Sequence, residues 1–408
     1  MANNNDKKVL NVPALRFPEF TEEWEEHYLA EYLDFKNGLN PSANKFGSGI
    51  KFISVMDILN NDFITYDCIR TSVEITPEEQ VAFAVEKGDM LFQRSSETLE
   101  DVGRANVYMD DRPAVFGGFV IRGKKKAEYN PMFFRYLLAS PYARKKVIPM
   151  GAGAQHFNIG QDGLSKVKLH FPILQEQQKI ADLLRLINER ISTQNKIIED
   201  LKKLKSAISK HLFARKDLLE TTICLSNIAT LKNGYAFQSS KYNALGKWKI
   251  LTITNVSGER YINDEDCNCI INLPNDIQDH QVLKEGDILI SLTGNVGRVS
   301  LCKNGDYLLN QRVGLLQLAK NVNQEFLYQI LSSQKFENSM IACGQGAAQM
   351  NIGKGDVESY VLPYSSNGNN ILWVAKILHS YDECIINEMR RLTLLTMQKQ
   401  YLLTQMFI

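Results

Sequence analysis

The sequence contains an internal duplication of about 195 residues, and this feature constrains the fold more than any other. Lys36-Asn37-Gly38 recurs as Lys232-Asn233-Gly234, and Val102-Gly103-Arg104 recurs as Val296-Gly297-Arg298. Four further pairs of segments match in the same order: 51–58 with 249–256, 86–91 with 284–289, 133–140 with 326–333, and 151–160 with 344–353. Chance does not keep six blocks in order at nearly one offset, so the chain is expected to contain two related bodies.

A long helix with the apolar spacing of a coiled coil ends each copy. Steps of four and three residues alternate in the first seam, which comprises Ile180, Leu184, Ile187, Ile191, Gln194, Ile198, Leu201, Lys205, Ile208 and Leu212. An offset of 194 gives the second seam: Val374, Leu378, Tyr381, Ile385, Glu388, Leu392, Leu395, Lys399, Leu402 and Met406. Because a folded body separates them, the two helices are expected to pair antiparallel. The alternative is that each helix lies on its own body.

Short branched strands alternate with a few helical stretches in the two bodies, which favours an α+β fold over a doubly wound sheet. Residues 51–58 and 249–256 are predicted to be strands because branched apolar residues alternate in both. The expected order is an N-terminal arm (1–20), body 1 (21–172), a first helix (173–215), body 2 (216–368) and a second helix (369–408). Anchor blocks repeat while the segments between them differ, which suggests two binding specificities on one frame.

Motifs for catalysis, metals and membranes do not emerge from the sequence. No nucleotide-binding G-x-G, P-loop or nucleophile motif is complete, and Cys267-x-Cys269 lacks a second ligand pair at zinc spacing. The glycine-rich segments 151–160 and 344–353 are better explained as tight turns than as phosphate cradles. Scattered cysteines and the lack of an apolar leader or spanning segment predict a cytoplasmic protein. A formal net charge of only +1 is low for a protein that binds nucleic acid alone.

The order of these blocks resembles the specificity subunit of type I restriction–modification systems. In the second copy the resemblance rests on segments 286–289, 294–298, 310–312 and 346–352, followed by the long helix. In the first copy it rests on Pro13–Pro18 with Trp24 and on Phe171–Ala181, which contains Glu176-Gln177-Gln178. Two departures are evident: the second helix has Asn369-Asn370-Ile371 in place of that Glu-Gln-Gln run, and Phe116-Gly117-Gly118 is aligned with Asn310-Gln311-Arg312.

The resemblance implies two target-recognition domains related by a pseudo-two-fold axis and joined by two antiparallel coiled-coil helices. Each domain is expected to read one half of a bipartite, asymmetric site in double-stranded DNA, with the coiled coil setting the spacing. Such a subunit is not an enzyme and is expected to hold no cofactor or metal. It docks two modification subunits, which bind S-adenosylmethionine and methylate adenine, and two restriction subunits, which use ATP and Mg²⁺. Partners that neutralise DNA phosphates would explain the low net charge.

Base-reading residues are expected near the repeated turns, where polar side chains can reach the major groove. In body 1 the candidates are Lys36, Asn37, Arg94, Arg104, Gln155 and His156. In body 2 they are Lys232, Tyr235, Asn255, Thr293, Asn295, Arg298, Gln311, Arg312 and Gln349. An alternative for the residues shared by both copies, Arg104 with Arg298 and Asn158 with Asn351, is that they hold the frame. Two other functions stay open: a coiled-coil scaffold with two protein-binding domains, and an enzyme with an unrecognised site.

Overall fold

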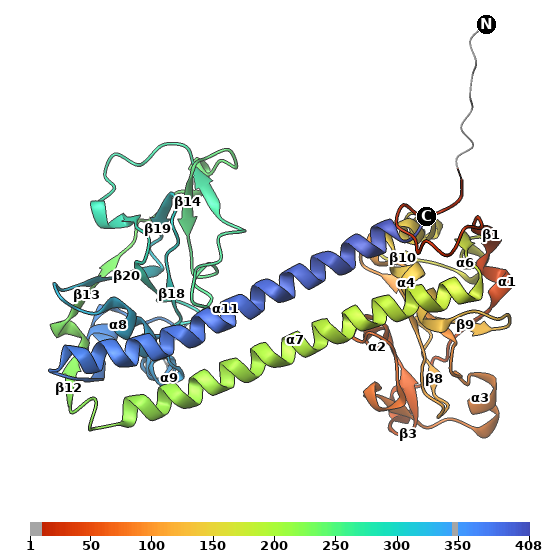
Figure 1. Ribbon diagram of the computed structural model, residues 1–408, viewed down its shortest axis with the longest axis horizontal. Helices are drawn as coiled ribbons and strands as arrows, with labels where there is room; N and C mark the ends of the chain where they lie inside the picture. The colour runs from red at the N-terminus through yellow and green to blue at the C-terminus, as the bar shows by residue number, and fades with distance from the viewer. Residues whose placement is uncertain (1–9, 345–349) are drawn as a thin grey trace, which may run out of the picture. The chain divides into compact units, whose positions relative to one another are not determined.

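The computed structural model describes residues 10–344 and 350–408, which pack as two compact units (Figure 1). The first unit comprises residues 1–195 and 391–408, and the second comprises residues 196–390. Each unit therefore contains one body together with part of both long helices.

A four-stranded antiparallel sheet in the order β2-β9-β5-β7 forms the centre of body 1. Its strands are β2 (Leu33–Asn37), β5 (Met90–Gln93), β7 (Ala105–Val107) and β9 (Val120–Lys125). An outer sheet has the order β4-β3-β8, with β3 (Phe46–Ile53), β4 (Ser72–Val73) and β8 (Val115–Phe116). Smaller pairs join β1 (Glu25–Tyr28) to β11 (Lys168–Phe171) and β6 (Ser95–Ser96) to β10 (Phe157–Asn158). The helices are α1 (Leu29–Tyr32), α2 (Val55–Asn60), α3 (Pro77–Ala82), α4 (Pro131–Ala139), α5 (Pro141–Val147) and α6 (Gln161–Ser165).

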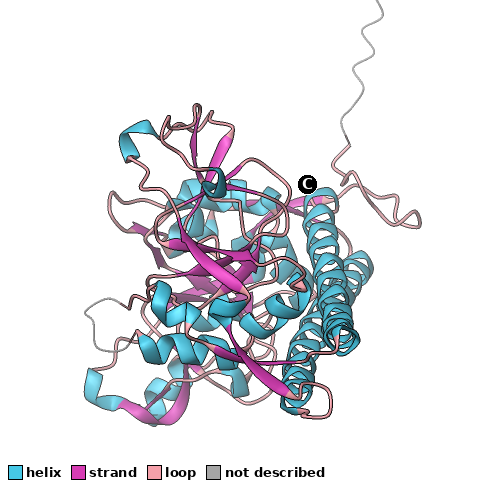
Figure 2. Cartoon of the chain, turned by 90° about the vertical axis from the view of Figure 1, so that its left-hand side faces the viewer, coloured by secondary structure: helices cyan, strands magenta, loops and turns pink. Residues whose placement is uncertain are grey.

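Body 2 repeats the topology of the central sheet, whereas its outer sheet has four strands instead of three. Its central sheet has the order β13-β20-β17-β18, with β13 (Ala229–Asn233), β17 (Ile288–Ser291), β18 (Val299–Leu301) and β20 (Val313–Leu318). Its outer sheet has the order β15-β14-β19-β16, with β14 (Trp248–Leu251), β15 (Asn268–Ile270), β16 (Val282–Leu283) and β19 (Tyr307–Leu309). A further pair joins β12 (Thr221–Cys224) to β21 (Val361–Tyr364), and the helices are α8 (Gln324–Leu331), α9 (Gln334–Cys343) and α10 (Lys354–Glu358). The duplication and the α+β class are confirmed, and Figure 2 shows helices and strands mixed within the bodies.

The two long helices are α7 (Leu174–Ala214) and α11 (Gly368–Gln405). Every residue of both seams is buried or half-buried, whereas apolar residues off the seams, such as Leu186, Leu394 and Met397, are exposed. In the first unit the early turns of α7 share a core with the last turns of α11. In the second unit Lys205, late in α7, pairs with Asp382, early in α11, at 2.6 Å. Both contacts give the helices an antiparallel sense.

The cores also show that each helix packs on a body as well as on its partner helix. The main core of the first unit combines Phe133 of α4, Leu184 of α7 and Leu402 of α11. The main core of the second combines Phe326 of α8, Leu212 of α7 and Leu378 of α11. The two arrangements considered for the helices therefore occur together. None of the helices in the described part of the chain is long and apolar enough to cross a membrane.

The strand expected over residues 51–58 is shorter than predicted, because α2 begins at Val55. The carboxylate of Asp57 accepts hydrogen bonds from the backbone N–H and the hydroxyl of Ser54, both at 2.7 Å, and so caps this helix. In body 2 the strand ends at Leu251, and the Asn255 side-chain oxygen accepts from the Thr252 N–H at 2.8 Å. One capping device thus ends the strand in both bodies. The alternating pattern missed it because Val and Ile also fit a short helix.

Candidate nucleic-acid interface

Three loops meet at one edge of each central sheet. The first follows the buried strand β5 or β17 and contains the repeated Val-Gly-Arg block. A backbone hydrogen bond closes the base of this loop. The Gly103 N–H donates to the Gln93 carbonyl in body 1, and the Gly297 N–H donates to the Ser291 carbonyl in body 2, both at 2.9 Å. The two glycines have φ of 68° and 79°, and a Cβ on either would lie within 2.7 Å of a neighbouring side chain. The glycine is therefore repeated for its backbone conformation and for space.

The second loop is the turn that precedes β9 or β20. It passes so close to the repeated Lys-Asn-Gly turn that only glycine fits there. A Cβ on Gly38 would lie 2.1 Å from the Gly117 carbonyl oxygen, and one on Gly234 would lie 2.2 Å from the Asn310 carbonyl oxygen. The Lys-Asn-Gly block thus recurs because two backbone segments must touch.

The third loop is the end of the repeated glycine-rich segment, residues 151–159 in body 1 and the described residues 350–352 in body 2. The Asn158 side-chain oxygen accepts from the Ser95 hydroxyl, and the Asn351 side-chain oxygen accepts from the Thr293 hydroxyl at 3.1 Å. The next residues, Ile159 and Ile352, donate their N–H groups to the first loop at 2.9 Å. Asn158 and Asn351 therefore hold the frame, in agreement with that interpretation of the repeat.

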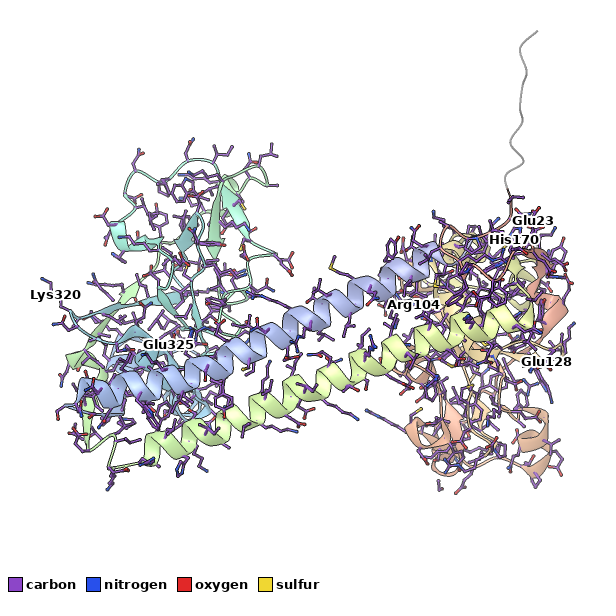
Figure 3. All side chains as sticks on the ribbon, viewed as in Figure 1. Glu23, Arg104, Glu128, His170, Lys320 and Glu325 are labelled. Atoms are coloured by element: carbon purple, nitrogen blue, oxygen red, sulfur yellow. The ribbon has the colours of Figure 1, made fainter. Side chains whose placement is uncertain are left out.

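The candidates in body 1 divide into exposed and engaged side chains. Asn37, Gln155 and His156 are exposed. Lys36 donates to the Ala82 carbonyl at 2.8 Å and lies over the Phe83 ring, so its ammonium is engaged by the protein. Arg94 donates to the Gly118 carbonyl at 3.2 Å. Arg104, which is labelled in Figure 3, pairs with Asp101 at 2.6 Å but stays 53% exposed.

In body 2, Asn295, Gln311 and Arg312 are exposed, and Lys232 is half-buried on β13. The Tyr235 hydroxyl donates to Asp276 at 2.8 Å, which raises the pKa of Tyr235. Thr293 is bonded to Asn351, and Arg298 lies 3.5 Å from Glu337. Gln349 lies outside the described residues.

The assignment of Asn255 as a base reader is wrong. Its side chain is 3% exposed, and both ends of the amide are used internally: the oxygen by Thr252, and the nitrogen by the Asn263 carbonyl at 2.8 Å. It is the counterpart of the capping residue Asp57. A buried, fully bonded amide presents nothing to a base edge.

Body 1 also contains two basic runs, Lys124–Lys126 and Arg144–Lys146, and several of their side chains have partners within the body. Arg144 donates to the carbonyls of Glu100 and Val102, and its burial lowers its pKa to about 10. Lys124 and Lys125 face glutamates at 3.4 and 3.3 Å. Lys145, Lys146 and Lys126 are exposed. Lys124 and Lys125 are half-buried, so these last three are the most accessible lysines of the two runs.

The alignment of the second loop changes by one residue in the structure. Val120 starts β9 and Val313 starts β20. In the strand pairing, Asn37 lies opposite Ile121 in body 1, and Asn233 lies opposite Gly314 in body 2. The counterpart of Asn310-Gln311-Arg312 is therefore 117–119, and not 116–118. Arg312 corresponds to Phe119, which is 67% exposed and which the sequence comparison passed over. Strand register, invisible in a gapless motif match, was the missing signal.

A buried polar network fastens body 2 to the long helices. The Asp382 carboxylate on α11 accepts from Lys205 of α7 at 2.6 Å, from Arg260 of the loop before β15 at 3.0 Å, and from Gln329 of α8 at 2.6 Å. Arg260 also forms a bidentate pair with Glu325, which is labelled in Figure 3. The polar seam residue Lys205 thus helps to position body 2.

The first unit has its own version of this network. Asn188, which corresponds to Asp382, donates to the Asp62 carboxylate at 2.9 Å and to the Tyr136 hydroxyl at 3.0 Å. Arg135 donates to the Asp62 carbonyl at 3.2 Å. Burial lowers the pKa of Lys399, the counterpart of Lys205, against the attraction of Asp62. The acidic group is on the helix in one unit and on the body in the other.

The N-terminal arm binds the glutamate of the Glu-Gln-Gln run that occurs in the first helix alone. Arg16 of the arm makes a bidentate pair with Glu176, both bonds at 2.7 Å, and the Glu176 side chain is fully buried. The Leu15 N–H donates to the Gln405 carbonyl at the end of α11. In the second unit, Glu220 instead accepts from the N–H and hydroxyl of Ser366 next to the start of α11. Asn370, which takes the place of Glu176 in the second helix, donates to the Leu218 carbonyl at 3.0 Å.

The described residues contain no group of three or more His, Cys, Asp or Glu side chains placed to hold a metal ion. In the C-x-C pair, burial raises the pKa of Cys267 to about 11, and this thiol accepts from the Asn255 amide at 3.3 Å. A thiol with a raised pKa is a poor ligand and a poor nucleophile at neutral pH. Asp264, close by, is bound by Lys249 at 2.8 Å and Lys303 at 2.9 Å, and these hydrogen bonds hold its pKa below its usual value.

The comparisons with known proteins agree with this architecture. Residues 21–203 and 220–397 match the family described as "Type I restriction modification DNA specificity domain". The chain is 24% identical over 378 residues to a putative type I restriction enzyme MjaX specificity subunit of Methanocaldococcus jannaschii, covering 87% of this chain and 86% of that one. It is 23% identical over 360 residues to the MjaVIII specificity subunit of the same organism, covering 82% and 80%.

The fold is similar to that of the type I restriction–modification S subunit from M. genitalium, with a TM-score of 0.57 at 16% identity, covering 97% of this chain and 99% of that one. A second structure, from a study of assembly and conformational transition of the type I R-M system, gives a TM-score of 0.59 at 14% identity over 93% and 96% of the chains. Since the two matched segments cover most of the sequence, the chain belongs to the family of type I restriction–modification DNA specificity subunits.

Proposed function

We propose that each body reads one half of a bipartite, asymmetric site in double-stranded DNA. The observation that carries this proposal is the three-loop edge, defined by the first, second and third loops above. The two bodies hold these loops with equivalent backbone hydrogen bonds but present different exposed side chains from them. Two bodies that share a backbone frame but differ in their exposed side chains are suited to reading two different half-sites.

The side chains free to read bases are the exposed ones at this edge. In body 1 they include Gln155 and His156, and in body 2 Asn295, Gln311 and Arg312. Asn37 is also exposed, but its side-chain nitrogen donates to the Gln161 amide oxygen at 3.1 Å. Amide and guanidinium groups match the donor and acceptor patterns of adenine and guanine in the major groove. Arg104, Arg298 and Thr293 serve the frame, because acidic or amide neighbours already bind them.

The chain itself does no chemistry in this proposal and acts in the cytoplasm as the DNA-reading part of a larger complex. Two modification subunits supply S-adenosylmethionine and adenine methylation, and two restriction subunits supply ATP- and Mg²⁺-dependent translocation and cleavage. The net charge of +1 supports this division, because most phosphate contacts would come from the partners. Reconstitution tests it: specific DNA binding and adenine methylation should require this chain and the modification subunit together. A chain that bound only proteins would instead support the scaffold alternative.

The outer surfaces of the long helices are suited to docking the modification subunits. Leu394, Met397 and Tyr401 of α11 are 65%, 63% and 59% exposed and recur at spacings of three and four residues. Such a stripe is what one helix presents to another. Replacing Leu394 and Met397 with Gln should weaken binding of the modification subunit, measured by sedimentation, and leave the helical content of the free chain unchanged.

The coiled coil would set the spacer between the half-sites. Inserting four residues into the middle of both helices lengthens each by about 6 Å, close to two base pairs at about 3.4 Å each. A methylation map of genomic DNA should then show a spacer about two base pairs longer. An unchanged spacer would refute the proposal that the coiled coil sets the spacer length.

Exchanging residues 21–172 for the body of another specificity subunit tests whether the bodies read independently. The half-site read by body 1 should change, and the other half-site should stay as it was. A simultaneous change in both half-sites would mean that the bodies act jointly.

A further inference from the structure

The turn before β9 in body 1 and the turn before β20 in body 2 can be matched residue by residue, because four backbone hydrogen bonds occur in both. In body 1 the backbone N–H groups of Gly117, Gly118, Val120 and Arg94 donate to the carbonyls of Ile53, Leu39, Gly117 and Phe119, respectively. In body 2 the N–H groups of Asn310, Gln311, Val313 and Leu292 donate to the carbonyls of Leu251, Tyr235, Asn310 and Arg312, respectively. Phe119 and Arg312 therefore occupy one position in the frame.

The backbone that carries Phe119 is tightly fixed. A Cβ on Gly117 would lie 2.7 Å from the Phe52 ring, and one on Gly118 would lie 2.0 Å from the side-chain oxygen of Asn40. The Arg94 guanidinium adds a fifth bond, to the Gly118 carbonyl. Phe119 is nonetheless 67% exposed. The side chain is thus presented outward from a preorganised turn, and its position costs little conformational entropy on binding.

A single exposed phenylalanine is ordinary on protein surfaces, so its position decides its meaning. Phe119 lies at the three-loop edge, where its counterpart is an arginine. The Arg312 guanidinium is exposed, and within the described part of the chain no hydrogen bond or ion pair of its side chain is found. One frame position therefore carries an open apolar group in body 1 and an open bidentate donor in body 2.

These two side chains can recognise only certain bases. A phenyl ring has no donor or acceptor, and the only apolar group in the major groove is the 5-methyl of thymine. A guanidinium is matched by O6 and N7 of guanine, its commonest specific partner. We propose, as a deepening of the proposed function on which it rests, that Phe119 contacts a thymine methyl in one half-site and Arg312 pairs with a guanine at the corresponding place in the other.

Base-analogue scanning tests the Phe119 contact. The probe is duplex DNA carrying the methylated motif of the complex between this chain and its modification subunit, with each thymine of the body 1 half-site replaced in turn by deoxyuridine. At one position this replacement should weaken binding about four-fold, which is the effect of removing one buried methyl group. Phe119→Ala should abolish that uracil effect. Phe63→Ala, which removes another exposed phenylalanine of body 1, should retain it.

A matched scan tests Arg312. Replacing each guanine of the other half-site by 7-deazaguanine should weaken binding about ten-fold at one position, by removal of half of a bidentate contact. Arg312→Ala should make the complex insensitive to that replacement. Phe119→Arg should shift one base pair of the body 1 half-site from T·A to G·C in a methylation map.

The outcomes separate the two levels of inference. A complex that neither binds nor methylates a split motif would refute the proposed function itself. A split motif with no uracil-sensitive thymine in the body 1 half-site, or a Phe119→Ala variant that stays uracil-sensitive, would overturn the Phe119 assignment alone. A guanine scan without effect would do the same for Arg312.

Discussion

Removal of the Asp382 carboxylate should loosen the attachment of body 2 to the long helices. The residue is 6% exposed, and three donors from three elements converge on it: Lys205, Arg260 and Gln329. Asp382→Ala leaves the Lys205 ammonium without its carboxylate in the helix seam. Breaking a buried ion pair on one side costs about 3–5 kcal/mol. Arg260 keeps its bidentate pair with Glu325, so the lower value, about 3 kcal/mol, applies here.

Hydrogen–deuterium exchange measures this change locally. A loss of about 3 kcal/mol should speed exchange in peptides from α8 and the first half of α11 about a hundredfold. The double variant Lys205→Met with Asp382→Leu should restore most of the protection, because well-packed apolar groups can replace a buried pair. Asp182→Ala is the control, since Asp182 is 48% exposed and lies 3.7 Å from Arg185.

The reasoning fails if Asp382→Ala speeds exchange less than about five-fold, or if the double variant is as unprotected as the single one. The first result would mean that water or another donor compensates the carboxylate. The second would mean that the packing around Asp382, and not its charge, holds α8 to α11.

Three further predictions concern pH, the repeated turn and the arm. The hydrogen bonds from its lysine neighbours lower the pKa of Asp264 in the folded state, so the stabilisation is complete above about pH 5 and is lost progressively as the pH falls from about 4 toward that lowered pKa. In ¹⁹F NMR of fluorotryptophan-labelled protein, the Trp248 signal should show this acid transition, and Asp264→Asn should remove it. Gly234→Ala should destabilise body 2 by about 2 kcal/mol or more in urea unfolding, whereas Gly355→Ala, with nothing within 4 Å of its new Cβ, should be neutral or stabilising. Arg16→Ala should cost about 3 kcal/mol by leaving a fully buried carboxylate unpaired, and limited proteolysis should then cut the arm faster.

The sequence by itself determined the duplication, the α+β class and the two seams, because these depend on periodicity and on the spacing of glycines. Lys-Asn-Gly and Val-Gly-Arg recur because the backbone at Gly38, Gly234, Gly103 and Gly297 leaves no room for a side chain, and such a requirement is legible in one residue type. The same local reasoning found Asn158 and Asn351 as parts of the frame.

Tertiary structure alone decided which polar side chains are open to a ligand. Asn255 has the composition of a base reader but is buried as a cap, and Lys36 is engaged by a carbonyl on another element. Phe119 emerged only when strand register aligned it with Arg312. Burial and hydrogen-bond partners come from residues distant in the chain, and so no local pattern encodes them.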